Sequence, residues 1–219
     1  MNSFCKKLSE GLVINLGCEI APLATKQTDG WHLKDKDGKD LGVFDLVIST
    51  APPVQTLKLF AQQIPESAPF TNRPLQGCYT LMLGFNTPWN KSWIAAKVHD
   101  SPIEWIAINS TKPARNSNVT CIVVHSNNAW AEQHIDDDQK YVEDYLKSQF
   151  ELIKNIKCAA DYVSLHRWRY ALLNEEEAVA PYFDGKSGLA STGDWCTASR
   201  IEDVWRSAME LVRQIQSNV

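Results

Sequence analysis

The stretch Leu189-Ala-Ser-Thr-Gly-Asp-Trp-Cys-Thr-Ala-Ser-Arg-Ile-Glu-Asp-Val-Trp205 contains a run of small residues, a Gly193-Asp194 turn and the start of a helix. Apolar residues then recur at helical spacing as far as Ile215. Ser199, with Glu202 three positions later, has the pattern of a capping box. A strand, a tight turn and a helix N-terminus in this order direct free backbone N–H groups and the positive end of a helix dipole toward one point. The stretch therefore predicts a place where a phosphate or another anion binds.

The same residues resemble a known family. The Gly193-Asp194 pair, then Trp-Cys, a short spacer and an Arg-Ile-Glu sequence before an aromatic helix, resemble the C-terminal flavin-contacting motif of renalase-like FAD-dependent oxidoreductases, in the amine oxidase superfamily. The resemblance implies that the Asp faces the ribityl-pyrophosphate region of FAD and that the helix N-terminus points at the cofactor. It assigns cofactor binding to Gly193, Asp194, Arg200, Ile201 and Glu202.

The motif also departs from the family pattern at three positions. Where the family has Gly-Gly before the Arg and a Gly after the Glu, this chain has Ala198-Ser199 and Asp203. A glycine lets the backbone approach a ligand closely, whereas each of these residues adds a Cβ and Asp203 adds a charge.

Length and composition are those of a soluble globular protein. The 219 residues can form one large or two small domains, and 44% hydrophobic with 22% charged residues is ordinary. A net charge of -4 with scattered Lys and Arg gives no electrostatic footprint for nucleic acid. The sequence has no run of about 18 apolar residues, and its six cysteines form no C-x-x-C pair. We therefore expect a cytoplasmic protein with reduced thiols that binds a small-molecule substrate, but no metal, nucleic acid or membrane.

The first quarter of the chain predicts the end of a helix, over residues 2–10, followed by strands bounded by turn residues. These strands are expected at residues 12–16, 19–27, 31–34 and 43–50. The last of them stops at Ala51-Pro52-Pro53, because proline cannot donate to a strand ladder. The resemblance implies that the backbone of Ile20 contacts the adenine end of FAD and that Thr50-Ala51 passes close to the cofactor.

The middle of the chain predicts an antiparallel sheet. Four apolar or alternating segments follow one another without intervening helices, at residues 75–85, 92–98, 104–109 and 119–125. A short helix is expected before them, at residues 55–62, and an amphipathic helix after them, at residues 136–153.

Residues 161–171 predict a further strand. Alternation places His166, Trp168 and Tyr170 on one of its faces and the two intervening arginines on the other. Two interpretations stay open. The resemblance implies a strand that runs toward the flavin, which makes Trp168 and Tyr170 candidates for the substrate pocket, whereas the pattern alone also fits a half-buried strand with an aromatic core face.

These elements predict a fold of the α+β or α/β class. The resemblance implies a partial FAD-binding domain, made of a β-meander and a C-terminal strand and helix, at residues 1–53 and 187–219. It implies an inserted substrate domain with an antiparallel sheet at residues 54–186. The ten glycines form no G-x-G-x-x-G, so the chain is expected to be the C-terminal part of an enzyme without the N-terminal dinucleotide-binding βαβ unit. Alone, it is expected to bind no FAD, to be inactive, and to self-associate through apolar surface and strand edges.

Two functions remain open at this level. The first is an FAD-dependent oxidoreductase that transfers a hydride from a small reduced substrate, a dihydronicotinamide or an amine, to the flavin, with no catalytic residue assigned. The second is a non-catalytic remnant or binding module that pairs with a partner or a second copy. Ala198-Ser199 and the absence of the glycine-rich turn favour the second. Serine hydrolase, zincin and P-loop sequences are absent.

Overall fold

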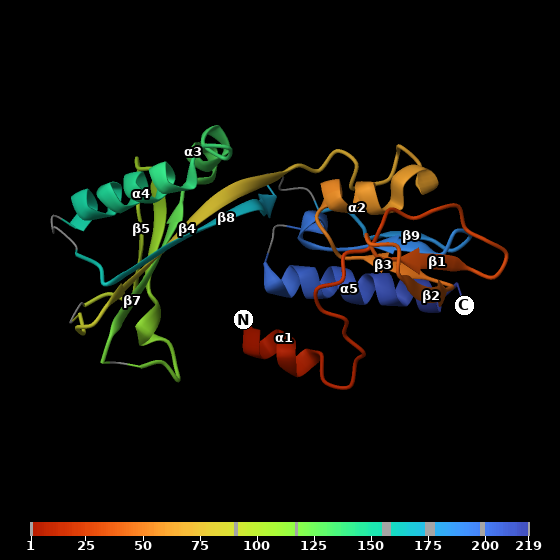
Figure 1. Cartoon of the computed structure of the whole chain (residues 1–219), viewed down its shortest axis with the longest axis horizontal. Coiled ribbons are helices and arrows are strands. Elements are labelled where there is room, and N and C mark those ends of the chain that lie inside the picture. Colours follow the sequence, from red (N-terminus) through yellow and green to blue (C-terminus); the bar gives the residue numbers. More distant parts are fainter. Residues whose placement is uncertain are drawn as a thin grey trace.

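The structure is a computed structural model, and it describes residues 2–89, 92–116, 118–154, 159–173, 178–197 and 200–218. The described residues form two lobes joined by long strands (Figure 1). One lobe is built on an antiparallel sheet with helices on one face. The other combines small sheets with helices and holds both ends of the described chain.

The first lobe contains a five-stranded sheet in which every neighbouring pair is antiparallel, as the sequence predicts. The strands lie in the order β5-β6-β7-β4-β8. Their bounds are Leu75–Phe85 for β4, Ala95–Lys97 for β5, Ile103–Ile108 for β6, Thr120–Ser126 for β7 and Tyr162–Leu173 for β8. A 3-10 turn, η2 (Asn109–Thr111), follows β6. Alternation along β4 places the buried side chains of Tyr79, Leu81 and Leu83 on one face.

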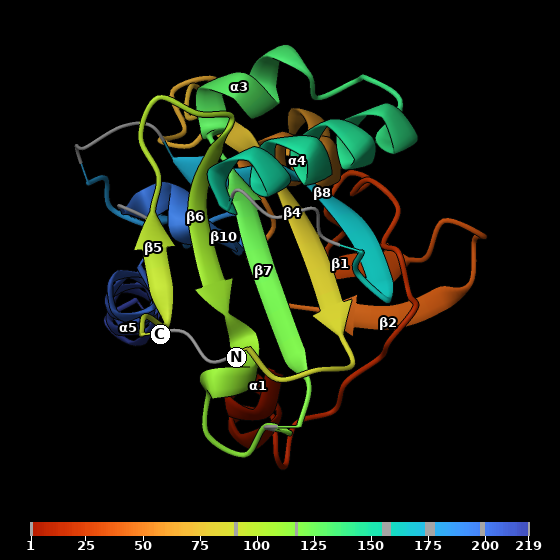
Figure 2. The same cartoon turned by 90° about the vertical axis from the view of Figure 1, so that its left-hand side faces the viewer.

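Two helices cover that buried face (Figure 2). Helix α4 (Gln139–Lys154) packs Val142, Leu146 and Phe150 into the sheet, where all three are fully buried. It begins three residues after the predicted start, because Asp138 precedes the helix and its carboxylate accepts the N–H of Tyr141 at 3.0 Å. The other face of the sheet is turned toward the side of the second lobe (Figures 1 and 2).

Helix α3 (Asn128–Gln133) was not predicted from the sequence. It is only six residues long, too short for a periodic pattern, and it is started by the side chain of Asn127, which accepts the N–H of Trp130.

The second lobe holds a three-stranded sheet, a hairpin and most of the remaining helices. In the sheet, β3 (Val47–Ser49) lies parallel to β10 (Leu189–Ser191), which lies antiparallel to β9 (Tyr182–Asp184). The hairpin pairs β1 (Trp31–Lys34) with β2 (Asp40–Phe44). The helices are α1 (Asn2–Leu8), α2 (Pro53–Phe60), the 3-10 turns η1 (Ala61–Gln63) and η3 (Asp194–Cys196), and α5 (Ile201–Gln216).

Three strand predictions in this lobe are wrong. Residues 43–50 form two strands, because Phe44 pairs with Trp31 in the hairpin whereas Val47 pairs with Leu189 in the other sheet. Residues 19–27 form only isolated bridges at their two ends. Residues 12–16 form no strand and are exposed, Val13 to 94%, because no described strand lies beside them to take their backbone hydrogen bonds.

The buried apolar residues gather in two clusters, one in each lobe. The second cluster is centred on Trp195 and includes Trp31, Phe60, Phe70 and Leu189. Three members of this cluster, Phe60, Ala68 and Phe70, come after residue 53, where the first segment of the FAD-binding domain is expected to end. The core of the second lobe therefore includes residues beyond that segment.

Candidate functional site

The carboxyl ends of β3 and β10 lie side by side. The two strands are in register, with Val47 opposite Leu189, and the N–H of Thr192 donates to the carbonyl of Ser49 at 3.2 Å. Thr50-Ala51 and Gly193-Asp194, which follow these strands, therefore leave the sheet at the same edge. In open α/β sheets, ligands bind outside the carboxyl ends of the strands. The structure thus brings together four residues that the resemblance assigns to the cofactor.

The packing of Trp195 explains why residue 193 is a glycine. A Cβ at Gly193 would lie 3.0 Å from Cδ1 and 3.2 Å from Nε1 of the Trp195 indole. The indole is fully buried, in edge-to-face contact with Phe70, and the guanidinium Nε of Arg73 donates to the Trp195 carbonyl at 2.8 Å. The tight turn is therefore held in place by the core beneath it.

Asp194 is half-buried at this edge. Burial raises the pKa of its carboxyl, and hydrogen bonds from the backbone of Trp195 and of Asp194 itself offset only part of that rise. Such a carboxyl repels a neighbouring phosphate less than an ordinary one, and it donates a hydrogen bond when it is protonated.

Several buried side-chain hydrogen-bond donors near the carboxyl ends of β3 and β10 have no partner in the part of the chain that the structure describes. The side-chain atoms Ser191 Oγ, Trp195 Nε1 and Thr197 Oγ1 are buried and have no hydrogen-bond partner within the described residues. A buried polar atom without a partner costs about 1–3 kcal/mol. Two of the three flank Gly193-Asp194, so the residues around the strand ends fit a polar, oxygen-rich group such as the middle of a flavin dinucleotide.

A cavity of about 520 Å³ connects one further predicted residue, Ile20, with Ala51. Its other walls are Glu19, Pro22 and three residues of α2: Gln55, Lys58 and Leu59. Residues 19–22 are held beside β1, because the N–H of Ala21 donates to the carbonyl of Lys34 at 2.9 Å. The lining residues of α2 were missed from the sequence, although Gln55, Lys58 and Leu59 have the spacing of one helix face.

The remaining predicted cofactor residues, Arg200, Ile201 and Glu202, lie on the first turn of α5 and are exposed. Arg200 occupies the N-cap position, and its side chain makes no capping hydrogen bond. The predicted cap, Ser199, lies outside the described residues. Ile201 and Glu202 line an apolar groove of about 750 Å³ between α1 and α5, rather than the edge at Gly193.

A direct hydrogen bond nevertheless joins the strand end to α5. Thr192 Oγ1 and Ser207 Oγ are 2.6 Å apart, and both residues are buried. Cys196, whose thiol lies 3.8 Å from the same Thr192 hydroxyl, has its pKa raised by burial. A low-pKa thiol nucleophile is therefore not available at this edge.

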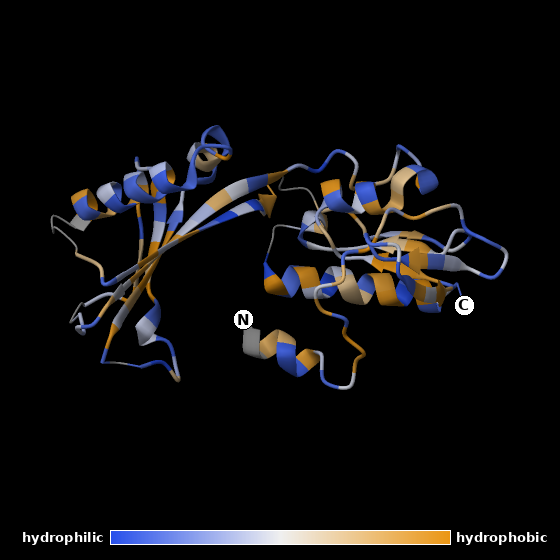
Figure 3. Ribbon diagram, in the orientation of Figure 1, coloured by the Kyte–Doolittle hydropathy of each residue, from blue (hydrophilic) through white to orange (hydrophobic). Residues whose placement is uncertain are grey.

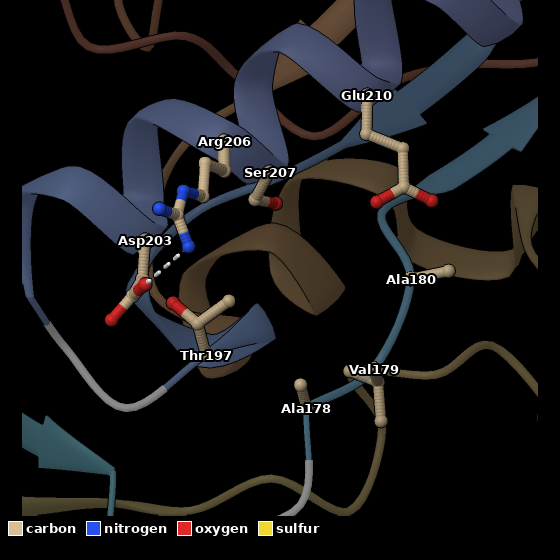
Figure 4. A pocket seen from close by; sticks show the side chains of 8 residues that line it. All are labelled: Ala178, Val179, Ala180, Thr197, Asp203, Arg206, Ser207 and Glu210. Atoms are coloured by element: carbon tan, nitrogen blue, oxygen red, sulfur yellow. Dashed lines mark ion pairs between the residues drawn. The ribbon is translucent and has the colours of Figure 1, made fainter.

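A second cavity, of about 310 Å³, lies between the first turns of α5 and residues 178–180 (Figure 4). Asp203, Arg206 and Glu210 line it, and the guanidinium of Arg206 is 3.9 Å from the carboxylate of Asp203. No residue predicted for the cofactor or the substrate lies in it.

One of the two candidate substrate residues, Trp168, lies on the uncovered face of the five-stranded sheet. Trp168 Nε1 donates to Thr80 Oγ1 at 3.0 Å, its ring contacts that of His166, and it is 51% exposed. Arg167 instead donates to the carbonyl of Ile135 on the helix side. The interpretation of an aromatic core face is therefore wrong. Tyr170 is half-buried, and it lies at an irregularity of β8 between Trp168, which pairs with Cys78, and Leu172, which pairs with Gln76.

The described part of the chain offers neither a cluster of metal ligands nor a membrane-spanning helix. It contains no group of three or more His, Cys, Asp or Glu side chains that could hold a metal ion. None of its helices combines the length and the apolar character needed to cross a bilayer.

No protein-family model matches the sequence. Solved structures match the fold instead. The whole chain superposes on 51% of a protein from Exiguobacterium sp. 255-15 described as a protoporphyrinogen oxidase, with a TM-score of 0.76 and 13% identity. A single-residue mutant of putrescine oxidase matches 99% of the chain with 52% of its own length, at a TM-score of 0.69 and 9% identity. An oxidoreductase from Methanosarcina mazei matches 90% of the chain with 49% of its own length, at a TM-score of 0.62 and 15% sequence identity.

The chain has the fold of about half of these oxidoreductases. It spans about half the length of the solved structures that it matches. The mixed α and β architecture with an antiparallel sheet, expected from the sequence, is shared with them.

Proposed function

We propose that the chain is one half of an FAD-dependent oxidoreductase of the renalase-like type, its C-terminal portion. The observation that carries the proposal is the common edge of the parallel strands β3 and β10, where Thr50-Ala51 and Gly193-Asp194 meet. The fold shared with half of three oxidoreductase structures supports it.

In this proposal the strand ends hold the middle of FAD. The half-buried carboxyl of Asp194 offers a hydrogen bond, and the Ile20–Ala51 cavity with Lys58 receives the adenosine end. Bound FAD would supply hydride acceptance, while the protein orients the ring and shapes the pocket. Arg200, Ile201 and Glu202 contribute to cofactor binding because they form the N-terminus of α5, which the resemblance directs at the cofactor.

The uncovered face of the five-stranded sheet is the proposed substrate side. Trp168 presents its indole there, held by a hydrogen bond to Thr80, and Tyr170, two residues further along β8, is the second candidate. The substrate class is a small reduced molecule, a dihydronicotinamide as in renalase-like proteins or an amine. One matched structure is putrescine oxidase bound to putrescine, with 9% identity, which is an example of the second class.

The apolar face of the second lobe is the proposed docking surface for the other half of the enzyme. This face consists of Ile201, Trp205, Met209 and Val212 on α5, Phe4 and Leu8 on α1, and residues 12–16. Figure 3 shows apolar residues along these segments. In the described residues, β3 is the edge of its sheet and Ile48 is exposed, although parallel sheets are normally covered on both faces.

The same face supports the second candidate function, a non-catalytic module that self-associates. A monomer that exposes a contiguous apolar patch is prone to association, and β3 offers an unpaired edge. Ala198-Ser199 and Asp203, in place of the family's glycines, favour this alternative.

Flavin content tests the proposal. The open reading frame that contains this chain, expressed in flavin-supplemented medium, is expected to give a yellow protein that releases FAD on denaturation. Asp194→Ala should lower the flavin-to-protein ratio at least several-fold, whereas Asp203→Ala, an acid on the neighbouring helix, should leave most of it. A colourless wild-type protein would overturn the oxidoreductase function and leave the binding module.

A further inference from the structure

Five side chains form one straight row across the uncovered face of the five-stranded sheet. Each strand contributes one residue, and each residue is the direct cross-strand partner of the next. In strand order the row is Lys97, Trp105, His125, Thr80 and His166. At the ordinary spacing of strands the row is about 20 Å long.

Burial of the neighbouring positions shows which way the row faces. Ile106, Val124 and Leu81 come next to row members along β6, β7 and β4, and all three are buried in the core under α3 and α4. Because successive side chains alternate across a sheet, the row points away from the helices. Trp105 accordingly keeps 41% of its surface exposed.

The two indoles on this face are too far apart to form one site. Trp105 lies on β6 and Trp168 on β8, with β7 and β4 between them, so about 14 Å separates their strands. Trp168 is already held by Thr80 and His166. Trp105 instead forms a wall of a separate cavity of about 320 Å³, at the other end of the row.

The size of this cavity limits its occupant. Ligand pockets usually measure about 300–1,000 Å³, so 320 Å³ accommodates one or two rings and excludes a dinucleotide. The indole face of Trp105 suits a flat partner, since aromatic rings stack in offset or edge arrangements. The remaining walls are polar: Cys78, Lys97, Glu104, His125, Ser126 and Asn128.

The charges at this end favour an acidic group on the occupant. The ammonium of Lys97 is 3.9 Å from the carboxylate of Glu104, and both side chains are exposed, so the pair contributes at most about 1 kcal/mol. A bulge between Ile103 and Trp105 brings Glu104 toward this cavity. Burial, with a smaller contribution from the charge of Lys112, lowers the pKa of the neighbouring His125. The cavity lining thus holds one ammonium, that of Lys97, in a weak pair from which another acidic group can displace Glu104.

We propose that the Trp105 cavity binds a planar aromatic or heteroaromatic molecule of one or two rings that carries an acidic group. Its ring stacks on Trp105, and its acidic group displaces Glu104 from Lys97. Binding itself needs no flavin. Only the role of this molecule as a substrate or product of the oxidoreductase rests on the proposed function.

Calorimetric titration of the 219-residue chain with 2-naphthoate tests the proposal, with 2-naphthalenemethanol as the neutral analogue of the same shape. Saturable one-to-one binding of naphthoate is expected, at least five-fold tighter than that of the alcohol. Trp105→Leu should weaken naphthoate binding at least ten-fold. Lys97→Gln should remove the preference for naphthoate and leave the alcohol unaffected.

Tyr141→Leu is the matched control, because Tyr141 has a similar exposure but lies on α4, on the other side of the sheet. It should bind naphthoate like the wild type, and thermal melts should show that every variant is folded. Absence of naphthoate binding, or equal weakening by Trp105→Leu and Tyr141→Leu, would overturn the proposal. Failure of FAD to bind would not contradict the proposal for the Trp105 cavity, because FAD binding concerns the strand ends of the second lobe.

Discussion

Helices α4 and α5 are both 16 residues long, and each carries an apolar stripe, yet their surroundings differ. Helix α4 buries Val142, Leu146 and Phe150 completely against the five-stranded sheet. Helix α5 buries only Ser207 and Leu211 and leaves most of its apolar stripe in solvent, with Trp205 52% exposed. A helix in a finished core covers its whole stripe, so the comparison indicates that α5 has room for a second partner.

The largest effect that sharpens this comparison is expected from Leu146→Ala on α4. Removal of a fully buried leucine leaves a cavity and should lower the free energy of unfolding by about 2–5 kcal/mol. Met209→Ala, on the exposed side of α5, should cost about 1 kcal/mol or less. Urea unfolding measures both. Equal losses would mean that the two helices are packed alike, contrary to the comparison.

A smaller loss is expected from Ser207→Ala, which breaks the buried contact between α5 and the end of β10. The mutation leaves the Thr192 hydroxyl with only the distant Cys196 thiol and should cost about 1–3 kcal/mol. Ser148→Ala on the exposed side of α4 is the control and should change the stability by about 0.5 kcal/mol or less. If the two variants unfold at the same urea concentration, the contact does not attach α5 to the sheet.

The third effect depends on pH. Burial raises the pKa of Asp194, so the folded chain holds this proton more tightly than the unfolded chain. The contribution of Asp194 to stability is unchanged below the ordinary pKa and falls as the pH rises from there through the raised pKa. Asp194→Asn removes this loss and should therefore gain stability relative to the wild type as the pH increases across that window. Unfolding curves at several pH values check the sign, and a gain toward low pH would contradict it.

The smallest change in stability is expected from Trp205→Glu, on the apolar face. Its side chain is half-exposed, so the free energy of unfolding should move by about 0.5 kcal/mol. Self-association and the binding of a hydrophobic dye should nevertheless decrease clearly in sedimentation and fluorescence measurements. A wild-type chain that is monomeric and binds no dye would refute the idea that α5 is prepared for a partner.

Local patterns predicted the first lobe well. Alternation over residues 75–85 gives the bounds of β4, because one face of that strand is buried by helices of the same chain. The order of its neighbours follows from successive strands without helices between them. The Lys97–Trp105–His125 part of the row was not predictable, because it depends on the register of three strands.

The second lobe shows where sequence patterns mislead. Residues 12–16 have the composition of a buried strand, but a strand forms only where a neighbour completes its hydrogen bonds. Thr50 and Gly193 are more than a hundred positions apart in the sequence, and the resemblance assigned both to the cofactor without showing that they share an edge of the sheet. The Ile20–Ala51 cavity needed the fold as well, since α2 closes it.

The 2.6 Å contact between the hydroxyls of Thr192 and Ser207 has a thermodynamic consequence. It ties the rim of the strand ends to the helix whose opposite side is open to solvent. A molecule seated at that rim and a protein seated on the helix would then alter each other's affinity by the same factor, since such linkage is reciprocal. Under the proposed function, loading with cofactor and assembly of the enzyme would in that case be a single coupled equilibrium.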